Sequence, residues 1–155
     1  MKILTSIPTL LQGSIFHDSR GSVSFVNEFT FAQVKRFYIV QNKEVKQVRA
    51  WHAHMKEAKN ILCISGKARV CAVPVDTIDN PSKDAHVYSF NLDATIPAVL
   101  HIPAGYANGF QSLTKNAKLM FFSTSTLEES KADDFRFPAD YWDIWGVKDK
   151  TLLTT

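Results

Sequence analysis

The chain has 155 residues, a net charge of +3 and 45% hydrophobic residues, with eleven Phe, three Trp and four Tyr. This length fits a single domain over residues 1–155, which buries about 70% of the surface of its unfolded chain. The basic residues are scattered, which argues against a nucleic-acid partner. No stretch approaches the length of a membrane span, and the first eight residues do not form a signal peptide. We therefore expect a cytoplasmic protein with no membrane partner.

Short β-prone segments recur along the chain and are separated by turns rich in Gly, Pro, Asn and Asp. Gly66-Lys67 and the segment 114–116 are expected to close two β-hairpins. Residues 138–145 are expected to form a short helical turn or a docked tail. In chain order we predict strands at 22–25, 34–40, 47–54, 60–65, 68–75, 85–92, 98–102, 106–113 and 117–124. This pattern predicts an all-β sandwich or barrel, and a jelly roll leaves a pocket between its sheets.

Two cysteines, Cys63 and Cys71, lie inside apolar strand-like runs. A disulfide framework requires more cysteines and a secretory context. We predict that both are reduced core residues.

The predicted strand 47–54 carries two histidines, His52 and His54, among apolar neighbours. Residues i and i+2 of a strand point to the same side, so both imidazoles should face one enclosed space. Arg49 has the opposite parity to His52, which places it on the other face of a regular strand. A β-bulge, or a strand that begins only at Ala50, would bring the two to one face.

Three interpretations of the histidine pair are open. A cupin metal site would combine His52, His54, Glu57 and a third histidine, but Asn108 occupies that last position and an amide is a poor ligand for a transition metal. We therefore expect no metal. A neutral histidine can instead remove a proton from a carbon beside a carbonyl, with the enolate stabilised by cations such as Arg49 and Lys59. The third interpretation is that both are hydrogen-bonded core residues.

Four motifs resemble those of a known family in order and spacing. They are Asp18-Ser19-Arg20-Gly21, Val48-Arg49-Ala50-Trp51-His52, Lys59 seven residues before Gly66, and the corner Ile102-Pro103-Ala104-Gly105-Tyr106-Ala107-Asn108-Gly109-Phe110. From about Ile15 to Trp145 the chain resembles the dTDP-4-dehydrorhamnose 3,5-epimerase family of cupins. The resemblance implies a cupin jelly-roll barrel, a homodimer, and catalysis without metal or cofactor. It also implies a nucleotide-linked 4-keto-6-deoxy sugar as substrate, in the synthesis of deoxysugars for cell-surface polysaccharides.

The resemblance implies roles for individual residues. His52 matches the catalytic base, and Lys59 and Arg49 match the cations near the keto oxygen of the sugar. Arg20 matches a contact to the phosphates of the sugar nucleotide. Asn108 and Tyr106 of the second corner motif are expected to contact the substrate.

The chain also departs from the family pattern. Asn108 stands where the family usually has histidine, and the segment 123–127 lacks the Tyr that supplies the second proton. No Asp is assigned as the partner of His52, and Tyr38 and Tyr106 are the candidates for the missing acid. These departures leave open a non-catalytic relative that binds a sugar nucleotide.

A second resemblance competes with the first. Residues 34–38, followed by His52-Ala53-His54, resemble the dTDP-sugar 3,4-ketoisomerases. This relationship implies that His52 and His54 both move protons, with Tyr38 assisting or positioning the substrate. We expect 3,5- or 3-epimerisation first and 3,4-ketoisomerisation second, since both pass through an enolate or enediol.

Overall fold

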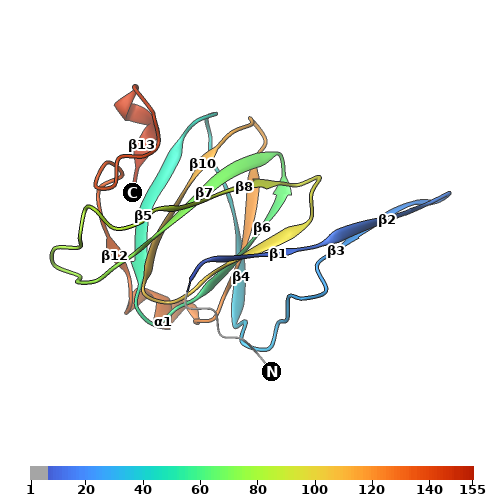
Figure 1. Cartoon of the computed structure of the whole chain (residues 1–155), viewed down its shortest axis with the longest axis horizontal. Helices are drawn as coiled ribbons and strands as arrows, with labels where there is room; N and C mark the ends of the chain where they lie inside the picture. The colour runs from blue at the N-terminus through green and yellow to red at the C-terminus, as the bar shows by residue number, and fades with distance from the viewer. Residues whose placement is uncertain (1–6) are drawn as a thin grey trace.

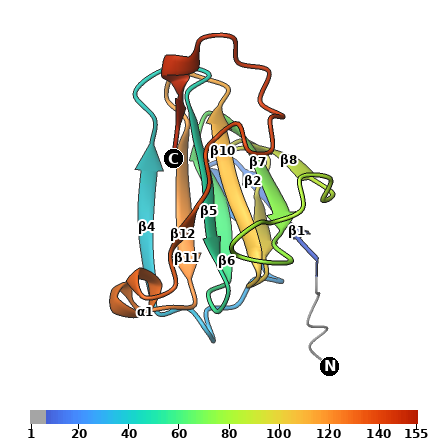
Figure 2. The same cartoon turned by 90° about the vertical axis from the view of Figure 1, so that its left-hand side faces the viewer.

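The computed structural model describes residues 7–155. In this range two antiparallel sheets face each other, with strand orders β1-β9-β6-β11-β4 and β12-β5-β10-β7-β8, and β13 is added to β5 (Figures 1 and 2). The elements are β1 (Thr9–Gln12), β2 (Ser14–Asp18), β3 (Gly21–Phe25), β4 (Arg36–Gln41), β5 (Val48–His54), β6 (Lys59–Ser65), β7 (Lys67–Pro74), β8 (Tyr88–Asp93), β9 (Ala98–Ile102), β10 (Tyr106–Ser112), β11 (Lys118–Ser123), α1 (Leu127–Lys131), β12 (Phe135–Arg136), η1 (Lys150–Leu152) and β13 (Leu153–Thr154). The all-β prediction is confirmed.

Both predicted hairpins are wrong in their pairing. Strand β6 pairs with β9 and β11, whereas β7 pairs with β8 and β10, so the Gly66 turn crosses from one sheet to the other. The connection from β10 to β11 crosses in the same way. A tight turn between two apolar strands looks alike in sequence whether the strands share a sheet or cover a common core. Gly66 is needed here because its φ is +65° and a Cβ would lie 2.2 Å from Thr114 Oγ1.

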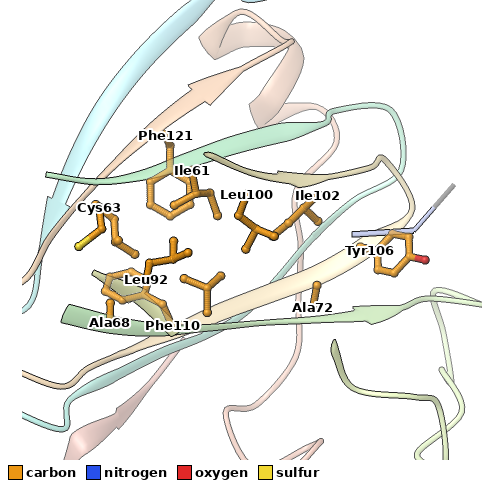
Figure 3. Packing of buried hydrophobic residues seen from close by; sticks show 12 residues of the cluster. Ile61, Cys63, Ala68, Ala72, Leu92, Leu100, Ile102, Tyr106, Phe110 and Phe121 are labelled. Atoms are coloured by element: carbon orange, nitrogen blue, oxygen red, sulfur yellow. The ribbon is translucent and has the colours of Figure 1, made fainter. Parts of the chain in front are cut away.

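The main core fills the space between the sheets (Figure 3). Ile61, Leu100 and Phe121 enter it from the five-stranded sheet, and Phe110 enters from β10 opposite them. Successive residues of a strand point to opposite faces, so strands with one face on this core and the other toward solvent alternate apolar and polar residues. Cys63 belongs to this core, and both cysteines are buried and free, as predicted.

A second apolar cluster covers the outer face of the six-stranded sheet. Trp51 of β5 packs against Trp142 and Trp145, with ring centroids 5.4 and 5.1 Å apart. The segment that carries these two residues runs along that face in an irregular path (Figure 2). Of the two alternatives predicted for 138–145, a short helical turn or a docked tail, the docked tail is the one that forms, and it explains why β5 is apolar on both faces.

The hairpin of β2 and β3 projects away from the two sheets as an arm (Figure 1). Among residues 7–155 its strands pair only with each other, and Phe16 and Val23 are 59% and 61% exposed. The Asp18–Gly21 turn, predicted from its residue types, forms the tip. No helix within residues 7–155 is long and apolar enough to cross a membrane.

Candidate active site

A β-bulge in β5 gives the histidine strand its geometry. His52 lies opposite Asn108 and Arg49 lies opposite Phe110, so Ala50 and Trp51 together face the single residue Gly109. The extra residue turns both Ala50 and Trp51 toward the outer cluster. Arg49 and His52 therefore share the inner face despite their opposite parity, as the bulge interpretation predicted.

His52 is half-buried near one end of the space between the sheets. Burial is the largest influence on its imidazole, and the nearby charges of Lys59 and Arg136 act in the same direction, so the pKa of His52 falls to about 4. The ring is neutral at physiological pH and can accept a proton. His52 is thus in the unprotonated form that a general base requires.

His54 lies on the same face and contacts a buried acid. Its Nδ1 is 3.0 Å from Oε2 of Glu57, which is an ion-pair distance, although the two atoms are not aligned as an ideal hydrogen bond. The strand places His54 opposite Tyr106 of β10. The predicted common face of His52 and His54 is confirmed.

Glu57 sits in the turn between β5 and β6, and the carboxylate of Asp133 holds this turn. Asp133 accepts hydrogen bonds from the backbone amides of Met55, Lys56 and Glu57 at 2.8 to 3.2 Å. This anchoring directs the Glu57 side chain inward, where none of it is exposed. Glu57, named from the sequence only as a candidate metal ligand, is therefore a buried carboxylate beside the histidines.

The Glu57 carboxylate has several partners in the interior. Ser123 donates a short hydrogen bond to Oε1, Ser130 of α1 donates to Oε2 at 3.0 Å, and Arg36 lies 3.8 Å from Oε1. Burial alone would raise the pKa of Glu57, but His54, Ser123 and the charge of Lys59 outweigh it and lower the pKa to about 2. Glu57 is ionised at neutral pH.

Lys59 begins β6 and supplies a buried cation. It is 7% exposed, and its Nζ lies 5.9 Å from the centroid of the Phe121 ring. Burial lowers the pKa of Lys59 to about 8, partly offset by the charge of Glu57. A poorly hydrated ammonium of this kind stabilises a developing oxyanion more strongly than an exposed one.

Tyr106 belongs to the main core, and Tyr38 packs against that core. Tyr38 stacks on Phe121 with ring centroids 5.0 Å apart, and the Arg36 guanidinium lies 4.7 Å from its ring centroid. Burial and the charge of Glu57 raise the pKa of Tyr38. Tyr106 is buried beside Tyr88, and burial raises its pKa as well. Both phenols therefore keep their protons at neutral pH.

Sequence reasoning missed two residues beside His52. Arg136 of β12 lies directly opposite His52 in the strand pair, and it forms an ion pair with Asp134 at 3.1 Å. Both charges act on His52 and on Lys59. Strand β12 has two residues, which is too short for a periodic sequence pattern to indicate a strand.

Two predicted substrate contacts lie apart from this cluster. Arg49 donates from Nε to Oδ1 of Asn42 at 2.8 Å, and it is not among the charges that act on His52 or Lys59. Arg20 is at the tip of the arm, with 87% of its side chain exposed and an ion pair to Asp18 at 2.6 Å. The sequence spacing did not indicate that the arm leaves the barrel of its own chain.

The ligand set of a cupin metal site is not assembled here. No group of three or more His, Cys, Asp or Glu residues in the range 7–155 could hold a metal ion. Asn108 is turned to the backbone, since its Nδ2 donates to the His52 carbonyl oxygen at 3.3 Å. The carboxylate of Glu57 is surrounded by hydroxyl donors and His54 instead.

Comparison with known proteins decides the family. Residues 6–150 match the sequence profile described as dTDP-4-dehydrorhamnose 3,5-epimerase. The chain belongs to the dTDP-4-dehydrorhamnose 3,5-epimerase family. Members of this family are isomerases. A search of the curated proteins found no significant match.

Solved structures share the fold at low sequence identity. The dTDP-4-dehydrorhamnose 3,5-epimerase from Elizabethkingia anophelis is 16% identical, with a TM-score of 0.76 and coverage of 100% of this chain and 90% of that one. A 3'-monoepimerase from Streptomyces bikiniensis, in complex with dTDP-quinovose, is 20% identical, with a TM-score of 0.73 and coverage of 94% and 78%. The 3,4-ketoisomerase QdtA from Thermoanaerobacterium thermosaccharolyticum, in complex with TDP, is 15% identical, with a TM-score of 0.65 and coverage of 90% and 95%. The predicted cupin jelly-roll fold is confirmed.

Proposed function

We propose that this family member is a cytoplasmic sugar-nucleotide epimerase acting on a dTDP-4-keto-6-deoxyhexose, and that it supplies deoxysugars for cell-surface polysaccharides. The observation that carries the proposal is the pairing of a neutral base, His52, with a buried cation, Lys59. The two lie close enough that, after burial, the charge of Lys59 is the largest influence lowering the pKa of His52. A base and a cation at this proximity suit proton removal next to a carbonyl.

The proposed reaction removes a proton from a carbon of the sugar and later returns one. His52 takes the proton from the carbon beside the sugar carbonyl, and the electrons of that C–H bond move to the carbonyl oxygen as an enolate. Lys59 stabilises the negative oxygen. Return of a proton to the opposite face of the carbon regenerates the carbonyl and inverts the centre.

The donor of the returning proton is not the family's Tyr. Thr126, in the corresponding segment, caps α1, and its Oγ1 accepts a hydrogen bond from the Glu129 amide at 3.2 Å. We infer that Tyr38, Tyr106 or His54 returns the proton. We infer that Asn108 and Arg136, which flank His52 on the neighbouring strands, contact the sugar nucleotide.

A second candidate reaction is 3,4-ketoisomerisation, and the contact between His54 and Glu57 favours it. This reaction removes a proton at C3 and returns one at C4, so the carbonyl moves without inversion at C5. A second histidine that is held beside His52 by an ionised carboxylate could carry that proton between neighbouring carbons.

Isotope exchange separates the two reactions. The protein is incubated with dTDP-4-keto-6-deoxyglucose in D2O, and the ring protons are followed by NMR. Deuterium at C3 and C5 supports epimerisation, whereas deuterium at C4 with the carbonyl moved to C3 supports ketoisomerisation. The absence of exchange at high enzyme concentration would rule out both reactions for this substrate.

We also propose that the protein works as a homodimer in which the arm of one chain reaches the partner. The apolar side chains Phe16, Val23 and Phe25 share one face of the arm and are exposed. An arm that packs against a second copy would cover them and would carry Arg20 toward the partner's sugar-nucleotide phosphates. Val23→Asp should convert a dimer to a monomer in analytical ultracentrifugation, with Ser24→Asp, on the opposite face, as the control. A dimer unaffected by Val23→Asp would contradict this role of the arm.

A further inference from the structure

The Glu57 carboxylate is the most enclosed charged group near the proposed base, and each of its oxygens is occupied. Ser123 and Arg36 lie on the Oε1 side, and Ser130 and His54 Nδ1 lie on the Oε2 side. None of the Glu57 side chain is exposed. A substrate therefore cannot reach this carboxylate directly, and its influence must pass through the groups that it touches.

His54 is the only one of these groups whose bonding leaves a second reactive atom. Its Nδ1 is buried, with Glu57 as the polar neighbour, whereas Nε2 has no hydrogen bond to any residue in the range 7–155. An ionised carboxylate beside Nδ1 favours a proton on that nitrogen. In the neutral ring Nε2 then carries the lone pair, and in the protonated ring it carries the exchangeable proton.

We propose that Glu57 is a positioning residue that holds the Nδ1–H form of His54, so that Nε2 exchanges the second proton with the sugar. This inference rests on the proposed proton-transfer function and names the group that completes it. His52 removes the first proton, and His54 Nε2 either donates a proton or receives one, with Glu57 keeping the ring orientation constant. The same arrangement serves epimerisation and ketoisomerisation.

The surrounding structure is consistent with this assignment. In the segment where the family carries its Tyr acid, this chain forms the capped helix α1, whose Ser130 donates to Glu57. Asp133, just after the helix, holds the turn that delivers Glu57. The segment that lacks the family's Tyr thus helps to hold Glu57, the carboxylate that orients His54.

Glu57→Gln tests the assignment because it keeps the size of the side chain and removes its charge. We expect the rate of deuterium exchange, measured as kcat, to fall about 100-fold, the scale of a misplaced acid–base group, with KM changed less than about threefold. Glu57→Asp should recover part of the rate. Glu44→Gln, at an exposed carboxylate outside the site, is the matched control and should leave both constants unchanged.

A direct measurement of the imidazole separates positioning from simple stability. In protein labelled with ¹⁵N-histidine, long-range ¹H–¹⁵N spectra report the tautomer of each of the five histidines, and the signal lost in His54→Gln identifies His54. We expect the Nδ1–H form in the wild type and in Glu57→Asp, and a mixture of tautomers in Glu57→Gln. If Glu57→Gln does not fold, Ser130→Ala should give the same trend in exchange rate at a smaller magnitude.

The outcomes distinguish this inference from the proposed function. An Nε2–H tautomer in the wild type, or an unchanged tautomer and kcat in Glu57→Gln, would overturn the role of Glu57 even if the protein is an epimerase. A wild type that exchanges no proton with the sugar nucleotide contradicts the proposed function, while the tautomer spectra still decide whether Glu57 orients His54.

Discussion

Asn108 lies directly opposite His52 in the paired strands β5 and β10, and its Nδ2 donates to the His52 carbonyl oxygen at 3.3 Å. The amide thus occupies the position where a metal-binding cupin would offer an imidazole, and it is bonded to the backbone. A metal at this place would have to recruit an amide, which is a poor ligand for transition metals.

We therefore predict catalysis that does not depend on a metal. Elemental analysis of the purified protein should find far less than one transition metal per chain, and incubation with EDTA should leave the exchange rate unchanged. Activity restored only by one divalent metal after chelation would contradict this prediction.

His52→Ala is expected to abolish deuterium exchange, since it removes the proposed base beside Lys59. A loss of about 100-fold or more is the scale of a removed general base. Far-UV circular dichroism should remain that of the wild type, which separates lost chemistry from lost fold. Exchange that persists in this variant places the base elsewhere, and a severe loss in His54→Ala favours the use of both histidines.

The pH dependence of kcat/KM should follow His52 and Lys59. The pKa of His52 is about 4, so its neutral base form is present above that pH and is lost below it. The pKa of Lys59 is about 8, so the stabilising cation disappears as the pH rises through that value. We expect a bell-shaped profile with limbs near these two values. Lys59→Arg, which stays charged, should move only the basic limb upward; an unmoved limb would assign it to another group.

Arg136 and Asp134 should shift the acidic limb in opposite directions. The charge of Arg136 lowers the pKa of His52, and the charge of Asp134 raises it. Arg136→Gln is therefore expected to raise the pKa of His52 and to require a higher pH for activity, whereas Asp134→Asn should lower it. Titration of the His52 ring by NMR measures this without substrate. Shifts of the same sign in both variants would contradict the placement of β12.

Gly109→Ala should destabilise the fold at the bulge. A Cβ at this position would lie 2.5 Å from Ala50 Cβ and 2.9 Å from the Arg49 carbonyl oxygen. Relief of such a clash requires the backbone or its neighbours to move, at a cost of about 1–3 kcal/mol in the free energy of unfolding. Urea denaturation should show a lower midpoint with an unchanged m-value. An unchanged midpoint would mean that the bulge adapts freely.

The strands could be predicted from the sequence because burial of one face imposes a two-residue alternation of apolar and polar residues. Residues 47–54 and 106–113 were predicted within a residue of β5 and β10, and a docked tail was one of the two alternatives predicted for residues 138–145. The pairing of the strands could not be predicted from the sequence. A turn such as Gly66-Lys67 carries the same residues whether it joins neighbours in one sheet or crosses between two, and long-range contacts decide which.

By itself, the sequence determined the type of the fold, the position of the histidine strand and the candidate residues on it, because residue spacing and motif order are local properties. Only the tertiary structure decided which of them meet. It brings Arg136 across from His52 and buries Glu57 against His54, and it leaves Arg20 on a projecting arm. These relationships join residues far apart in the chain, and the burial and charge that set the pKa values of His52 and Lys59 exist only once both sheets have closed around them.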